Sequence, residues 1–113
     1  MHELAITQSM FDIVLREAEQ AEASQVRKVN LVIGEMTGVV DQCVRFYFDL
    51  LSRGTIAEGA DLCVRMVPPR ARCRNCAEVF ELRPFRWTCP RCQGTELEVI
   101  AGRELFVESI EVE

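Results

Sequence analysis

The chain has 113 residues, of which 49% are hydrophobic, and a formal net charge of −5. This length predicts one compact unit with a modest core. No stretch reaches the roughly 20 apolar residues of a membrane span, and the N-terminus lacks the basic and then apolar pattern of a secretory signal. We therefore expect a cytoplasmic protein that does not associate with a membrane.

The charge is distributed unevenly along the chain. The stretch from Pro68 to Gln93 holds six arginines and two glutamates, a net charge of +4. The remainder holds 7 basic and 16 acidic residues, a net charge of −9. An acidic body therefore carries a basic insert.

The first half of the chain predicts two helices and one strand. Apolar residues recur at helical spacing over residues 3 to 22, and they alternate over residues 26 to 35, which indicates a helix and then a half-buried strand. Gly34 and Gly38 predict a turn. A second helix should start at Asp41 as its N-cap and run to about Ser52. Because this helix is apolar on most sides, we expect it to be well buried.

The second half predicts three further strands around the insert. Residues 61 to 67 alternate as a strand, which Pro68-Pro69 ends. Residues 97 to 112 predict a strand, a tight turn at Ala101-Gly102 and a last strand. The alternation of the last strand changes phase near Glu108-Ser109, which predicts a β-bulge there.

Four of the six cysteines form a pattern typical of a metal site. Cys73 and Cys76 form one C-x2-C pair, and Cys89 and Cys92 form a second pair after twelve residues. Two such knuckles can place four thiolates tetrahedrally around Zn²⁺, and this closed ligand set indicates a structural site. Two disulfides are disfavoured in a reducing compartment. A rubredoxin-type iron also fits four thiolates, but nothing else indicates electron transfer, so zinc is preferred.

The insert has little apolar material of its own. Its cover should come from a hairpin that carries Val79, Phe80, Phe85 and Trp87. The metal should therefore supply most of its folding free energy. Cys43 and Cys63 stand apart and are interpreted as small buried apolar residues, although Cys63 lies on the strand face opposite Leu62 and could be partly exposed.

This order of elements predicts the fold class. We expect an α+β fold in which two helices pack on a small mixed β-sheet, with an inserted zinc ribbon of four cysteines. Residues 1–68 and 94–113 should form the α+β domain, and residues 69–93 the ribbon insert.

The N-terminus offers a second metal site. His2 is the only histidine, and its amide and imidazole nitrogens could chelate one metal together with the amine of Met1. The amide nitrogen or the carboxylate of Glu3 could complete the site, and planar nitrogen ligation suits Ni²⁺ or Cu²⁺. A cation opposes the dipole at a helix N-terminus, so the first residues would have to stay unwound. The alternative is a solvated histidine that binds nothing.

The motifs together resemble those of the HypA/HybF family of hydrogenase nickel-incorporation proteins. The stretches are "MHELAITQSMFDIV", "VNLVIGEMTGVV", "CRNC" followed by "W-x-CPRC", and "GRELFVESIEVE". The resemblance covers essentially the whole chain. It implies nickel ligation by His2 with Met1 and Glu3 beside it, and structural zinc on the four cysteines. Some members have histidines beside the zinc knuckles, and this chain has none.

The resemblance also implies a function. It predicts a non-enzymatic nickel metallochaperone that works with a HypB-type GTPase and passes Ni²⁺ to the large-subunit precursor of a [NiFe]-hydrogenase, without nucleic-acid or membrane partners. The oligomeric state stays open.

The alternative is a nucleic-acid-binding or adaptor zinc ribbon. The six arginines, Phe85 and Trp87 favour it, and the acidic body opposes it. A zinc hydrolase is disfavoured because the cysteine site is closed and no second histidine exists to build an open one.

Overall fold

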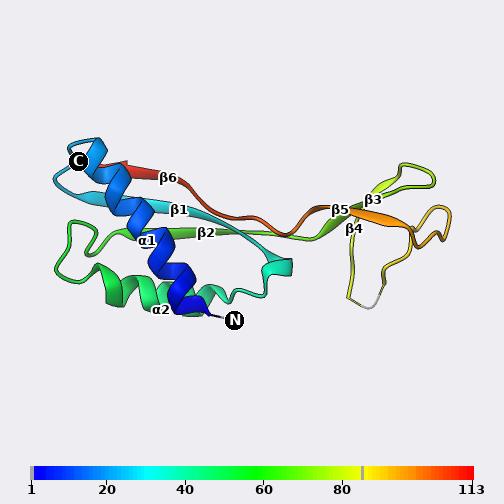
Figure 1. Cartoon of the computed structure of the whole chain (residues 1–113), viewed down its shortest axis with the longest axis horizontal. Coiled ribbons are helices and arrows are strands. Elements are labelled where there is room, and N and C mark those ends of the chain that lie inside the picture. The colour runs from blue at the N-terminus through cyan, green and yellow to red at the C-terminus, as the bar shows by residue number, and fades with distance from the viewer. Residues whose placement is uncertain (1, 85) are drawn as a thin grey trace.

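The computed structural model describes residues 2–84 and 86–113 and arranges them as an elongated molecule of 55 × 25 × 17 Å (Figure 1). Neither of its α-helices is long and apolar enough to cross a membrane within this described part of the chain. In chain order, the elements are α1 (Glu3–Gln20), β1 (Val26–Gly34), η1 (Glu35–Thr37), α2 (Asp41–Ser52), β2 (Asp61–Val67), β3 (Arg70–Cys73), β4 (Val79–Glu81), β5 (Leu97–Ala101) and β6 (Leu105–Val112).

The larger end of the molecule, here called the α+β part, consists of α1, α2 and a sheet of order β2-β1-β6. β1 pairs with β2 in parallel and with β6 antiparallel, so the sheet is mixed. Helix α1 crosses the strands, and its Phe11 meets Phe48 of α2 edge to face, with ring centroids 5.4 Å apart. The predicted α+β class is therefore confirmed.

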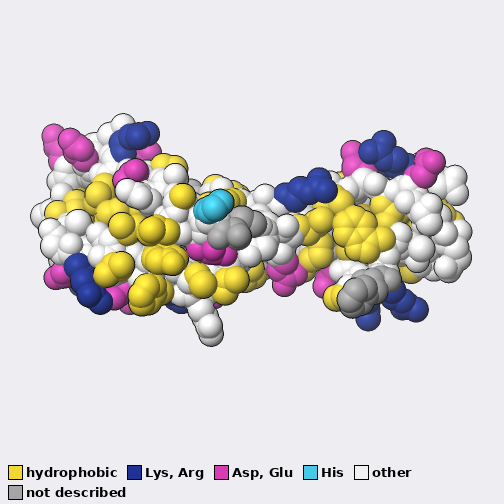
Figure 2. All heavy atoms as spheres, turned by 60° about the horizontal axis from the view of Figure 1, so that its bottom comes forward, with side chains coloured by type: hydrophobic (Ala, Val, Ile, Leu, Met, Phe, Trp, Pro, Cys, Tyr) yellow, Lys and Arg dark blue, Asp and Glu magenta, His cyan; other side chains and the backbone are white. Residues whose placement is uncertain are grey.

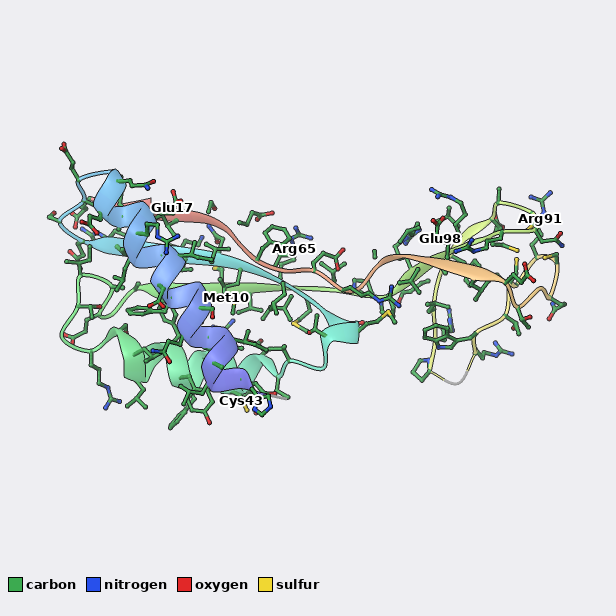
Figure 3. The ribbon with its side chains drawn as sticks, in the orientation of Figure 1. Met10, Glu17, Cys43, Arg65, Arg91 and Glu98 are labelled. Atoms are coloured by element: carbon green, nitrogen blue, oxygen red, sulfur yellow. The ribbon has the colours of Figure 1, made fainter. Side chains whose placement is uncertain are left out.

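The core of this part forms around β1 because β1 is the central strand. Leu31 and Ile33 are buried on the face that carries the helices. The sequence predicts a half-buried strand, but Val32 on the opposite face is also buried. In register, Val32 lies between Arg65 of β2 and Phe106 of β6, whose long side chains flank it. Arg65 also reaches Glu108 across the sheet, at 3.1 Å (Figure 3).

The predicted bulge in the last strand is confirmed. Asn30 lies opposite Ser109 and Leu31 lies opposite Val107, so Glu108 is the extra residue. The extra residue restores the phase of the alternation, and Val107 and Ile110 both pack against the core.

The prediction that α2 is well buried is wrong. Val44, Phe48 and Ser52 are buried along one face, whereas Phe46 is 64% exposed and Leu50 is 48% exposed. The helix packs on α1, and Arg45 donates to the carbonyl of Leu62 in β2 at 2.7 Å, whereas Phe46 and Leu50 face water. Its start also differs from the prediction: the N-cap is Val40, and Asp41 in the first turn instead binds Arg45 at 2.8 Å. The first helix ends at Gln20 rather than residue 22.

The two strands around Ala101-Gly102 do not pair with each other. β5 pairs with β3 in a second sheet of order β4-β3-β5, and β6 pairs with β1. Residues 97 to 101, expected in the α+β domain, therefore lie in the sheet next to the cysteines. The division into two domains stays a prediction.

The two sheets meet at a narrow neck in which backbone segments touch directly. The N–H of Met36 donates to the carbonyl of Gly102 at 2.7 Å, and the N–H of Gly34 donates to the carbonyl of Glu104 at 2.6 Å. Gly102 has a φ of +115°, and a Cβ on it would lie 2.8 Å from the Cα of Pro69. A Cβ on Gly34 would overlap the carbonyl of Gly102. Both glycines are therefore required by close approach of the backbone.

We predict that Gly34→Ala lowers the free energy of unfolding by about 3 kcal/mol, because backbone at the neck must move to make room. The control Gly59→Ala adds a Cβ in open space at a φ of +78°. It should cost only about 1 kcal/mol of backbone strain. Urea unfolding followed by circular dichroism measures both, and equal losses would contradict the role of the neck.

Candidate metal centres

The smaller end of the molecule, residues 70–101, is here called the ribbon. It contains β3, β4 and β5, and few of its described side chains are buried: Ala71, Cys73, Leu82 and Cys89. The predicted apolar cover is wrong in part, because Val79 is 39% exposed and Trp87 is 49% exposed. Phe85 lies outside the described residues. The buried Leu82 was missed in the sequence, since it stands alone between charged neighbours.

The four predicted cysteines come together in the ribbon. Their sulfurs all lie within 4.8 Å of one another, with Cys73 to Cys92 and Cys76 to Cys89 each at 3.5 Å. A disulfide would need about 2 Å, whereas a zinc tetrahedron with bonds of about 2.3 Å fits such spacings. All four are free cysteines, so the structure has no disulfide between them. The arrangement is a closed set of four thiol ligands.

The two knuckles repeat one backbone pattern. The N–H of Cys73 donates to the carbonyl of Glu78 at 2.8 Å, and the N–H of Ala77 donates to the carbonyl of Cys73 at 2.9 Å. The same two bonds recur at the same offsets from Cys89, each at 2.9 Å. Ala77 and its counterpart Gln93 both have a φ of +64°. Each knuckle thus turns its two sulfurs toward one point.

The sulfurs differ in how readily they ionise. The backbone N–H of Gly94 and a neighbouring thiol lower the pKa of Cys92 to about 6. The backbone N–H of Glu78 favours the thiolate of Cys76, but burial and hydrogen bonds with Cys89 and the other thiols raise the pKa of Cys76 to about 12. Four negative charges this close repel one another, and a divalent cation would replace the protons that the cluster otherwise retains.

We predict that a strong chelator unfolds the ribbon and leaves the α+β part folded, since the ribbon has almost no core to replace the metal. Trp87 is the only tryptophan and lies in the ribbon, so its fluorescence should change. Circular dichroism at the helical minimum should persist, because both α-helices lie elsewhere. Loss of both signals together would contradict this separation.

We predict that Ala77→Gly and Gln93→Gly each stabilise the ribbon by about 0.5–1 kcal/mol, because glycine removes the strain of the left-handed backbone. Chelator concentration at half-loss of Trp87 signal measures this. Glu22→Gly is the control, since it relieves a φ of +54° outside the ribbon. The same gain in all three variants would show that the effect is not local to the knuckles.

The N-terminus lies on the α+β part. His2 is exposed and precedes the first helical residue, and its carbonyl accepts the N–H of Ile6 at 3.1 Å. Glu3 begins the helix, so its own N–H belongs to the first turn, where no intrahelical acceptor exists. A metal on this nitrogen would therefore break no helical hydrogen bond, although the unfavourable position of a cation at the positive end of the helix dipole is unchanged. Met1 lies outside the described residues.

A shallow hollow adjoins His2. It has a volume of about 420 Å³ and is lined by His2, Glu3, Leu4, Ala5, Gln8 and Tyr47. Figure 2 shows the histidine at the surface, away from the ribbon. Among the described residues, the structure brings the four cysteines into one cluster and leaves His2 and Glu3 outside it.

The two remaining cysteines lie outside the cluster. Cys43 of α2 is half-buried, and Cys63 of β2 is exposed. The prediction of partial exposure holds for Cys63, because it points away from the helix-covered face. The interpretation as small buried residues is wrong for Cys63 and only half correct for Cys43.

The fold and the cysteine cluster define a small α+β metal-binding protein with a four-thiol ribbon, and comparison with known proteins gives the class. A family model described as "Hydrogenase/urease nickel incorporation, metallochaperone, hypA" matches residues 1–112. The chain belongs to this HypA family of metallochaperones and is not an enzyme.

Individual relatives are similar to this chain over all or nearly all of their length. The chain is 46% identical over 113 residues to the hydrogenase maturation factor HypA of Dehalococcoides mccartyi, covering all of this chain and 95% of that one. It is 42% identical to HybF of Escherichia coli, with both chains fully covered. A solution structure of a HypA protein superposes with a TM-score of 0.75 at 20% identity, covering all of this chain and 97% of the other. The nickel metallochaperone HypA of Helicobacter pylori gives 0.68 at 20% identity, covering 99% of this chain and 97% of that chain, and both share the fold.

Proposed function

We propose that this chain carries Ni²⁺ at its N-terminus and delivers it to the large-subunit precursor of a [NiFe]-hydrogenase, in the cytoplasm and together with a HypB-type GTPase. Nickel is the cargo, and zinc is the resident metal of the ribbon. The observation that carries the proposal is the position of His2: the only histidine is exposed, directly before a helix whose first N–H groups are free.

The nickel ligands would be His2, Met1 and Glu3. The amine of Met1 and the two nitrogens of His2 offer fused chelate rings, and Glu3 adds an amide nitrogen or a carboxylate. Such nitrogen-rich ligation suits Ni²⁺. The exposure of His2 supports a site from which a metal can leave without disturbing the core.

The zinc ligands would be Cys73, Cys76, Cys89 and Cys92. Their free thiols and the spacing of their sulfurs suit Zn²⁺, and the closed set leaves no position for a substrate. Zinc would therefore hold the shape of the ribbon. We also keep the division into an α+β domain and a ribbon domain as part of this proposal.

Charge argues against the nucleic-acid alternative. The ribbon holds six arginines and four glutamates, and Zn²⁺ with four thiolates adds a further −2. A ribbon with no net positive charge lacks the electrostatic attraction on which phosphate binding depends.

We predict that the zinc-loaded chain with a native N-terminus binds about one Ni²⁺ and that His2→Ala abolishes this binding, because no other imidazole is present. Extension by one residue before Met1 should abolish it too, since the amine moves away from His2. Calorimetric titration of Ni²⁺ measures both.

Asp12→Asn is the matched control, because Asp12 is an acidic residue of the same helix, more than two turns from its start. Its nickel affinity should equal that of the unaltered chain. Nickel binding that survives both N-terminal changes would place the site elsewhere and overturn the proposal.

A further inference from the structure

The hollow beside His2 is built by two helices. Five of its lining residues come from the stretch between His2 and Gln8, and the sixth, Tyr47, comes from α2. The start of α1 lies at α2 (Figure 1), and the contact between Phe11 and Phe48, which directly follows Tyr47, joins the two helices. At this hollow, α2 therefore places one side chain beside the proposed nickel ligands.

Two polar residues of the hollow are not proposed as ligands, and they differ in rigidity. Tyr47 is half-buried, and its ring meets the ring of Phe46 edge to face, with centroids 5.4 Å apart. A tyrosine has only two side-chain torsions, so a packed ring positions its hydroxyl at little further cost in entropy. Gln8 is exposed and loses more conformational freedom when it is ordered. Tyr47 is therefore the better preorganised of the two.

The chemistry of His2 calls for such a partner. Chelation by the backbone nitrogen of His2 closes the smaller ring through Nδ1, which leaves the Nε2–H of the imidazole as a hydrogen-bond donor. A metal-bound histidine usually donates this second ring N–H to a neighbouring acceptor, which fixes the ring and raises its basicity. His2 is exposed and precedes the first helical residue, so the helix itself does not hold its ring.

We propose that Tyr47 is a positioning residue of the nickel site, and that its hydroxyl accepts the Nε2–H of His2 when nickel is bound. The inference rests on the proposed function and deepens it, because it gives α2 a part in holding the cargo. Tyr47 makes no bond to the metal itself. It orients the imidazole, and its loss weakens nickel binding without removing a ligand.

The test is Tyr47→Phe in the full zinc-loaded chain with its native N-terminus. Calorimetric titration should give about tenfold weaker binding of Ni²⁺, since loss of an outer hydrogen-bond partner commonly costs this much in metal affinity. The ligand-field absorption of bound nickel should shift too, because the basicity of the imidazole changes. The ring is kept, so the urea midpoint of the metal-free α+β part should be unchanged.

Two control variants remove polar groups close by. Ser9→Ala removes a hydroxyl of α1 that lines a different hollow, and Gln8→Ala removes the other polar residue of the hollow at His2. Both should match the unaltered chain in nickel affinity and in the absorption of bound nickel.

The outcomes separate this inference from the proposed function. Equal affinity and absorption in Tyr47→Phe, with binding that His2→Ala still abolishes, would overturn the inference alone. Weaker binding in Gln8→Ala but not in Tyr47→Phe would also overturn it, and so would a lowered urea midpoint in Tyr47→Phe, which would make the role structural. Absence of nickel binding that depends on His2 in the unaltered chain would overturn both.

Discussion

Four cysteine sulfurs within 4.8 Å of one another are the constraint on which the smaller half of this molecule depends. The ribbon buries only four described side chains, and two of these are cysteines. Hydrophobic burial alone cannot offset the conformational entropy of so many ordered residues. A metal bound by both knuckles would instead hold the ribbon together. The folded ribbon would then keep β3 and β5 in position where they run to the neck. A closed set of four thiolates is typical of a structural site, which suits a resident metal better than a transported one.

The α+β part is stabilised by hydrophobic burial rather than by metal binding. Its buried apolar side chains form one core around β1, packed by α1 and one face of α2, so we expect it to fold without a metal. This leaves the start of α1 free to hold an exchangeable ion. A chelate built on exposed His2 and the free N–H groups of the first helical turn could gain or lose a cation without a change in core packing. Under the proposed function, the two parts would therefore separate a resident metal from a transferable one.

Much of this arrangement is predictable from the sequence where local chemistry decides it. The C-x2-C spacing predicts the cysteine cluster, and the phase change near Glu108 predicts the bulge, because both depend on backbone period alone. Tertiary features are not predictable in this way. The apolar residues of α2 indicate burial, yet Phe46 and Leu50 face water because α2 has a neighbour on one side only. The pairing of β5 with β3 depends on contacts between residues distant in sequence. The neck does too: the sequence predicts Gly34 as a turn residue, whereas the structure requires glycine there because the backbone of Gly102 lies so close.

The proposed function requires the two metals to occupy chemically different sites. X-ray absorption at the nickel edge, on protein loaded with one equivalent each of zinc and nickel and with its native N-terminus, tests it most directly. We expect nitrogen and oxygen neighbours around nickel, supplied by the N-terminal residues, and four sulfurs around zinc in the parallel measurement at the zinc edge. Sulfur in the first shell of nickel would contradict it, because the cysteines would then hold the cargo.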